Sequence, residues 1–273
     1  MKAENRKNLP IGVFDSGVGG LTVAREIMRQ LPDENIVYFG DTARVPYGSK
    51  SEDNIIRFCR QIIRFLRTKD VKAIVIACNT ASALALETVK KEFDLPIIGV
   101  IVPGARAAVQ ATDNKKIGVI GTEATIRSKS YTHMIQKFLP DAEVIGKPCP
   151  LFVPLVEEGF LKHHITEEVI HIYLEELKNS DIDTVILGCT HYPLLRSGIM
   201  KYFGEGIHIV NPAYETALDL KAVLEKEDMV NAGDSLAKYE FYVSDAAEKF
   251  KKFADSILPY NVETIQQINI EEY

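Results

Sequence analysis

Two cysteines, Cys78 and Cys189, occupy matching positions in the sequence. Each comes directly after a short apolar run that is typical of a buried strand and directly before a segment with a helical pattern. Ligands of open parallel sheets bind beyond the carboxyl ends of the strands, so both thiols are expected where chemistry takes place. Free cysteine is often a small apolar filler. We assign that role to the other two, Cys59 inside a helical run and Cys149 between two prolines.

Two chemistries suit a matched pair of thiols: a redox disulfide, or an acid and a base that act across a substrate. Redox pairs are usually close in sequence, as in CxxC, which favours the acid–base pair here. With one group on each face of a carbon, a thiolate removes a proton and the opposite thiol donates one, which inverts the centre. The ordinary thiol pKa is about 8.5, and a helix N-terminus favours the thiolate, so a small downward shift of the pKa would suit neutral pH.

The elements that must position these thiols alternate between strand and helix. Apolar runs predict strands at residues 11–14, 36–39, 73–77, 97–101, 116–120, 143–145, 184–187, 207–210 and 240–243. Periodic segments predict helices at residues 21–30, 52–67, 81–92, 128–138 and 166–179, and another from residue 245. This alternation predicts an α/β fold with mainly parallel sheets flanked by helices.

A faint internal repeat runs through the chain. Residues 11–16 resemble residues 117–122, and residues 73–80 resemble residues 184–190, with a cysteine at the same point. Either match alone would suit any two strand–loop–helix units. Two matches in the same order predict two similar domains, with the active site in the cleft between them.

Turn residues mark where the chain passes from one domain to the other. Pro103-Gly104 and Asn211-Pro212 are the candidate crossover points. We therefore expect residues 1–98 with 212–273 to form the first α/β domain and residues 99–211 to form the second.

Small polar groups and glycines surround both thiols. Gly17, Gly19 and Gly20 let the backbone approach a ligand closely. Their turn lacks the G-x-G-x-x-G and GK[ST] patterns of nucleotide loops. Hydroxyl and amide side chains beside helix starts suit the carboxylates of a substrate; these are Ser16, Asn79, Thr80, Thr122 and Thr190.

Several other residues have two readings. Asp15 and His191 are candidates for holding or tuning the thiols, although Asp15 equally suits a helix N-cap. One of Glu157 and Glu158 is expected to face the site. Tyr47 suits either a simple turn with Gly48 or a hydroxyl that binds a carboxylate.

The composition describes a soluble globular protein. The 273 residues are 46% hydrophobic and 26% charged, with a net charge of -6 and no long basic run, so neither nucleic acid nor a membrane surface is expected as a partner. Residues 1–10 have no apolar core of a signal peptide. The four cysteines include no CxxC pair, which argues against zinc. A cytoplasmic enzyme with reduced thiols and no metal is the simplest interpretation.

Six segments carry a family resemblance. They are residues 13–21 (VFDSGVGGL), 40–48 (GDTARVPYG), 77–82 (ACNTAS), 118–122 (GVIGT), 152–159 (FVPLVEEG) and 188–193 (GCTHYP). They resemble signature motifs of the bacterial glutamate racemases, within the aspartate/glutamate racemase family.

The resemblance implies racemisation of L- and D-glutamate without pyridoxal phosphate or metal, the supply of D-glutamate for peptidoglycan, and a homodimer. It implies that Cys78 acts on the D-enantiomer and Cys189 on the L-enantiomer, with Asp15, His191 and Glu157 as helpers. It implies substrate contacts at Asp15, Ser16, Tyr47, Gly48, Asn79, Thr80, Thr122, Thr190 and His191.

Three alternatives stay open from the sequence. An aspartate racemase would use the same two cysteines with a different side-chain pocket. A cysteine hydrolase would use Cys189 and His191 as nucleophile and base, and would not need Cys78. A metabolite-binding regulator would need no chemistry at all.

Overall fold

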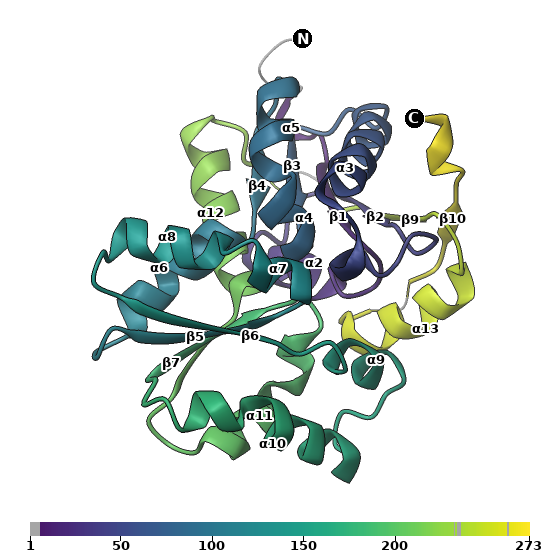
Figure 1. The fold of residues 1–273 in the computed structure, drawn as a ribbon. Helices are drawn as coiled ribbons and strands as arrows, with labels where there is room; N and C mark the ends of the chain where they lie inside the picture. The colour runs from purple at the N-terminus through teal and green to yellow at the C-terminus, as the bar shows by residue number, and fades with distance from the viewer. Residues whose placement is uncertain (1–5, 232, 234–235, 261) are drawn as a thin grey trace.

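The computed structural model describes residues 6–231, 233, 236–260 and 262–273. The first five residues of the expected first domain therefore lie outside the described part. Two parallel sheets flanked by helices make up the fold (Figure 1). The α/β class with mainly parallel sheets, predicted from the alternation of strands and helices, is confirmed.

The larger sheet has six strands in the order β10-β9-β2-β1-β3-β4, and the smaller has four in the order β6-β5-β7-β8. The central strands are fully buried, as parallel strands covered on both faces must be. The strands are β1 (Ile11–Asp15), β2 (Ile36–Gly40), β3 (Ala73–Ile76), β4 (Ile97–Gly99), β5 (Lys116–Gly121), β6 (Glu143–Pro148), β7 (Thr184–Gly188), β8 (His208–Val210), β9 (Tyr239–Val243) and β10 (Ile265–Gln267).

The sequence repeat has a structural counterpart. The order β2-β1-β3-β4 in one sheet matches β6-β5-β7-β8 in the other. The registers match as well, because Ile11 pairs with Ala73 and Ile117 pairs with Thr184, the residues that begin the repeated segments. The strands that precede Cys78 and Cys189 therefore hold equivalent places in two similar units.

Helices cover the larger sheet on both faces. The helices α2 and α12 pack with α13 on one face around Leu21, Leu220 and Phe250, and α3 packs on the other through Ile55 and Ile62. The helices are α2 (Leu21–Gln30), α3 (Glu52–Arg67), α4 (Asn79–Leu84), α5 (Leu86–Glu92), α6 (Ile101–Ala111), α7 (Glu123–Arg127), α8 (Ser130–Phe138), α9 (Phe152–Glu157), α10 (His164–Lys178), α11 (Arg196–Phe203), α12 (Pro212–Lys226) and α13 (Ala247–Ile257), with 3-10 turns η1 (Tyr47–Ser49), η2 (Tyr192–Leu195) and η3 (Ile270–Glu272).

The strand predicted over residues 97–101 ends at Gly99. The turn expected at Pro103-Gly104 is wrong, because both residues lie inside helix α6. Proline is tolerated in the first helical turn, where its missing N–H has no partner to lose. Gly104 allows close packing, since a Cβ there would lie 3.0 Å from Cγ of Pro212 at the start of α12. The two expected crossover points thus contact each other.

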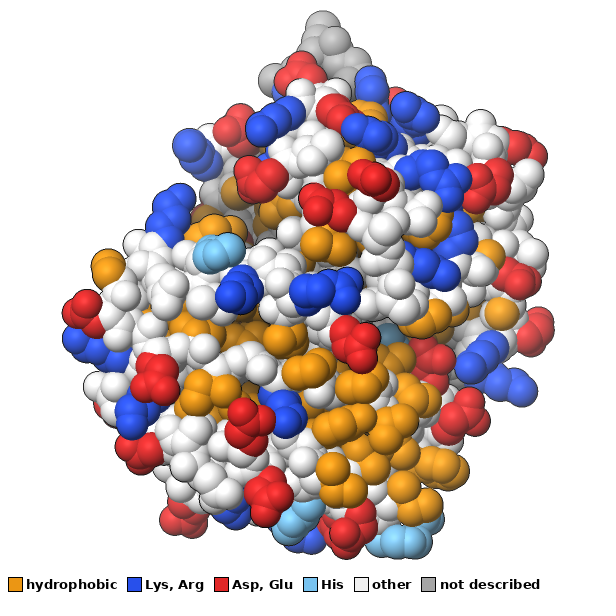
Figure 2. All heavy atoms as spheres, in the orientation of Figure 1, with side chains coloured by type: hydrophobic (Ala, Val, Ile, Leu, Met, Phe, Trp, Pro, Cys, Tyr) orange, Lys and Arg blue, Asp and Glu red, His pale blue; other side chains and the backbone are white. Residues whose placement is uncertain are grey.

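Apolar side chains gather on the surface over the region of α9 and the start of α10 (Figure 2). Leu151, Phe160, Leu161 and Ile165 are large apolar residues exposed there. Within the described residues, none of the helices has both the length and the apolar character of a membrane span.

A buried ion pair lies at the amino ends of two interior strands of the larger sheet, β2 and β3. The Lys72 side chain is fully buried, with Nζ 2.5 Å from Oε2 of Glu34, and it also donates to the carbonyls of Lys7 and Met229. We predict that Lys72→Met lowers the free energy of unfolding by about 3–5 kcal/mol, because the Glu34 carboxylate is left buried without its cation.

Urea unfolding followed by circular dichroism measures this loss. Lys116→Met is the control, because its pair with Asp181 is exposed and its removal should cost less than about 1 kcal/mol. Equal losses in the two variants would contradict the predicted cost of leaving Glu34 unpaired.

Candidate active site

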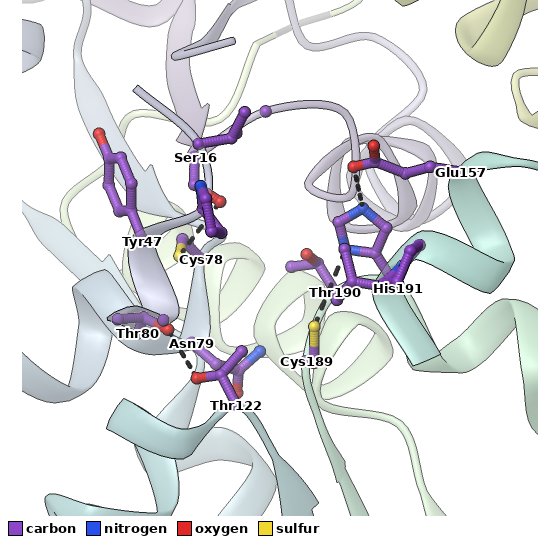
Figure 3. Close-up of a pocket in the computed structure, with 16 residues that line it drawn as sticks. Ser16, Tyr47, Cys78, Asn79, Thr80, Thr122, Glu157, Cys189, Thr190 and His191 are labelled. Carbon is purple, nitrogen blue, oxygen red and sulfur yellow. Dashed lines mark hydrogen bonds and ion pairs between the residues drawn. The ribbon is translucent and has the colours of Figure 1, made fainter. Parts of the chain in front are cut away.

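Cys78 and Cys189 line one pocket of about 200 Å³ between the two units. Figure 3 shows them on different sides of this pocket. The structure brings together almost the whole predicted site: Ser16, Tyr47, Gly48, Asn79, Thr80, Thr122, Glu157, Thr190 and His191 also line the pocket. Of the two glutamates, Glu157 is the one that faces it.

Gly17, which the sequence predicted to let the backbone approach a ligand, also lines the pocket. Four further lining residues were not singled out from the sequence: Val45, Pro46, Val153 and Pro154. They are apolar and carry no chemical signal of their own, although they stand inside the two motifs at residues 40–48 and 152–159. They supply apolar surface to the pocket.

Cys78 caps the N-terminus of α4, where its sulfur accepts the N–H of Ala81 at 3.5 Å. Its thiol also contacts Oγ of Ser16 at 3.7 Å. Burial, reinforced by the charge of Asp15, raises the pKa of Cys78 to about 12, and the contacts with Ala81 and Ser16 only partly offset this rise. The expected downward shift is therefore wrong for this thiol, because the loss of hydration outweighs a short helix. Cys78 carries its proton at neutral pH.

Cys189 has a different environment. Its sulfur lies 3.8 Å from Nδ1 of His191, whose Nε2 lies 3.2 Å from Oε1 of Glu157 (Figure 3). Burial acts to lower the pKa of His191, but the Cys189 and Glu157 side chains outweigh burial and raise it to about 10. The bond to His191 in turn lowers the pKa of Glu157. The result is an imidazolium beside the Cys189 sulfur.

The C-terminal helix reaches this group. Helix α13 lies beside α9 (Figure 1), and Nζ of Lys249 is 3.4 Å from Oε2 of Glu157. Glu157 therefore has a cation on each side. The motifs gave no signal for Lys249, because it stands in the last part of the chain, where no motif was found.

Asp15 is fully buried behind the pocket and is not among its lining residues. It accepts the N–H of Gly17 at 3.0 Å and the hydroxyl of Thr190 at 3.5 Å. Burial raises its pKa. It is not the N-cap of α2, since that position belongs to Gly20. Asp15 supports the neighbour of Cys189 instead of contacting the pocket.

Hydroxyl groups from both units meet in the pocket. Oγ1 of Thr80 lies 2.9 Å from Oγ1 of Thr122, which caps α7. Asn79 is oriented by the hydroxyl of Tyr131, which donates to its Oδ1 at 2.7 Å. These small groups are the polar donors that the sequence placed beside the thiols.

The Tyr47 hydroxyl is not free for a substrate. It donates to Oδ2 of Asp41 at 2.5 Å, so the ring forms a wall and the hydroxyl points away from the cysteines (Figure 3). Arg44 binds the same carboxylate at 2.7 Å and Oε1 of Gln61 at 2.6 Å. The residues that line the pocket include no lysine or arginine.

The fold and the site define an α/β enzyme with one thiol from each of two similar units facing a small pocket lined by polar and apolar side chains. A family model described as Asp/Glu/Hydantoin racemase matches residues 11–218. The chain belongs to this family.

The chain is similar over nearly its full length to several proteins named glutamate racemase. A glutamate racemase from Thermoanaerobacter pseudethanolicus is 47% identical over 97% of this chain and 98% of its own length. The crystal structure of a glutamate racemase isoform from Bacillus anthracis is 40% identical, with a TM-score of 0.92 over 96% of this chain and 98% of that one. A glutamate racemase from Francisella tularensis, in complex with D-glutamate, is 39% identical, with a TM-score of 0.91 over 98% of this chain and 100% of that one.

The charged state of His191 can be tested through its dependence on pH. Its pKa in the folded protein is about 10, above the ordinary value of about 6.5. The stabilisation from the imidazolium is therefore complete below about pH 6.5 and is lost as the pH rises through the folded value. We predict that Glu157→Gln lowers the His191 pKa, because a carboxylate that raises it is removed.

The His191 pKa in the two proteins is measured from the nitrogen chemical shifts of its ring, followed from pH 5 to 10.5. His208, an exposed histidine, gives the reference titration in the same spectra. A His191 midpoint near that of His208 in the unsubstituted protein would contradict the charged pair.

Proposed function

We propose that this protein racemises L- and D-glutamate by a two-base mechanism in which Cys78 and Cys189 exchange protons with the alpha carbon. One observation carries the proposal: two thiols follow equivalent strands, β3 and β7, and line a single pocket. The names of the relatives support glutamate as the substrate, and the Francisella tularensis relative binds D-glutamate.

The surroundings of the two thiols differ in a way that suits the L-to-D direction. In this direction Cys189, which lies beside the His191 imidazolium, acts as the base in its thiolate form and takes the alpha proton, so the C–H bond breaks and an S–H bond forms. The pair of electrons stays on the substrate. The Cys78 thiol then gives its proton to the opposite face, which forms the new C–H bond and leaves a thiolate at Cys78. The D-to-L direction runs through the same steps in reverse.

The polar groups of the pocket suit an amino acid with two carboxylates. Hydroxyls of Ser16, Thr80 and Thr122 and amides at the starts of α4 and α7 offer donors beside the cationic His191, without a lysine or arginine. The substrate's own ammonium then brings a further positive charge into the pocket. A cation near Cys78 favours its thiolate form, which the D-to-L direction requires. This chemistry needs no added cofactor.

A cysteine hydrolase with Cys189 and His191 has weaker support. An imidazolium beside a cysteine sulfur suits such a nucleophile as well, so the Cys189–His191 pair does not separate the two functions. The second thiol does, because Cys78 lines the same pocket and would have no role in a hydrolase. The aspartate racemase alternative differs only in the length of the substrate and is tested below.

The wider role follows from the glutamate assignment. We propose that the protein supplies D-glutamate for peptidoglycan in the cytoplasm and works as a homodimer. The apolar surface of Leu151, Phe160, Leu161 and Ile165 supports association with a second copy. We also keep the domain division into residues 1–98 with 212–273 and residues 99–211, which the two sheets support.

Each single substitution, Cys78→Ala or Cys189→Ala, should lower kcat for racemisation by at least about 10²–10⁴-fold, the usual contribution of a positioned acid or base. Circular dichroism of L- and D-glutamate without added cofactor measures it. Cys149→Ala is the control, because Cys149 is buried outside the pocket. Substantial two-way racemisation by either variant would contradict the assigned roles.

The enzyme should prefer glutamate over aspartate by at least about 100-fold in kcat/KM, because the shorter side chain leaves buried donors unpaired. The same optical assay on the two amino acids gives the ratio. Similar kcat/KM values would limit the assignment to an Asp/Glu racemase of broad specificity.

A further inference from the structure

Thr190, the residue after Cys189, is held by the opposite unit. Oγ1 of Thr22, in the first turn of α2, donates to the backbone carbonyl of Thr190 at 2.9 Å. The same hydroxyl lies 2.9 Å from the carbonyl of Gly19. Thr22 is 1% exposed and is not among the lining residues of the pocket. It is a buried hydroxyl that bonds the backbone next to a catalytic thiol without touching the substrate's space.

The backbone of the two units is in direct contact at this point. A Cβ on Gly19 would lie 2.3 Å from Oγ1 of Thr190 and 2.5 Å from Cε1 of His191. No side chain fits there, so the turn after β1 lies directly against the segment that carries Cys189. Asp15, at the end of β1, adds the contact with the Thr190 hydroxyl at 3.5 Å.

The same turn is also fixed relative to Cys78. Strand β1 pairs with β3, and the N–H of Ala77 donates to the carbonyl of Phe14 at 2.8 Å. One residue after the end of β1, Ser16 contacts the Cys78 sulfur at 3.7 Å. Residues 15–22 therefore connect the surroundings of both thiols by a short path.

We propose that Thr22 is a positioning residue that sets the separation of the two cysteine sulfurs, an inference that rests on the proposed two-base racemisation. Each sulfur must reach the same carbon from its own face. If Cys189 is displaced, the carbanion formed by Cys78 is returned to its starting configuration more often than it is inverted. The hydroxyl of Thr22 thus controls the partition between inversion and return.

The test replaces the hydroxyl with a methyl group. Thr22→Val has nearly the shape of threonine but cannot donate, and Thr22→Ser restores the donor. Thr216→Val is the matched control: Thr216 is fully buried, but its hydroxyl bonds the carbonyl of Pro212 within its own helix. All variants are compared with the unsubstituted protein as purified full chains, with their thermal unfolding recorded.

The experiment compares the rate of alpha-proton exchange with the rate of racemisation. Each protein converts D-glutamate in deuterium oxide, and mass and chiral analysis give the deuterium entering the remaining D-glutamate and the L-glutamate formed. We expect Thr22→Val to lose about tenfold in kcat with KM within about twofold, as a small misplacement of reacting groups would cause. The ratio of exchange to racemisation should rise in this variant and stay unchanged in Thr22→Ser and Thr216→Val.

An unchanged ratio in Thr22→Val, or an equal rise in Thr216→Val, would overturn the positioning role. If the unsubstituted protein does not racemise glutamate, it is the proposed function that fails. If Thr22→Val does not fold, Thr22→Ala removes the same donor with less bulk, and the ratio is read from that variant with the same two outcomes.

Discussion

In the proposed two-base racemisation, one carbon is approached from both faces, and this constraint requires two proton-transfer groups on separate supports. The two sheets share a four-strand order, and a cysteine follows the carboxyl end of an equivalent strand in each. The contacts between the two units are as necessary for the geometry of the site as the two sheets are. Gly19 packs against Thr190 without room for a side chain, and Thr80 meets Thr122 at 2.9 Å. Both contacts bring the two units together beside the pocket, which Thr80, Thr122 and Thr190 line.

The two thiols are equivalent in topology and different in electrostatics. Burial beside Asp15 keeps the proton on Cys78, whereas Cys189 lies beside the imidazolium of His191. In the proposed racemisation one thiol acts as the acid and the other as the base, as a proton relay through the substrate requires. Glu157 maintains the charge on His191, and Lys249 from α13 adds a contact from outside the segment that the family model matches. The C-terminal helix thus belongs to the electrostatic support of the site.

Local sequence was enough to predict much of this arrangement. The repeated segments begin at residues that pair in register, Ile11 with Ala73 and Ile117 with Thr184. The alternation of strands and helices, together with the repeat, was therefore enough to predict two similar sheets. What the sequence could not give depends on packing between distant segments. The direction of the Tyr47 hydroxyl is set by Asp41, and the pKa of Cys78 is set by burial. Gly104 lies inside helix α6, where Pro212 from a distant segment packs against it.

The central claim is that the proton removed and the proton delivered belong to different thiols. L-Glutamate carrying deuterium at the alpha carbon, converted in ordinary water and sampled at low conversion, tests this most directly. With one group on each face, the D-glutamate formed contains only solvent-derived hydrogen at that carbon, because the deuterium stays on the Cys189 side and is lost by exchange. D-Glutamate that retains deuterium from the substrate would show that a single group serves both faces, and would contradict the two-base account.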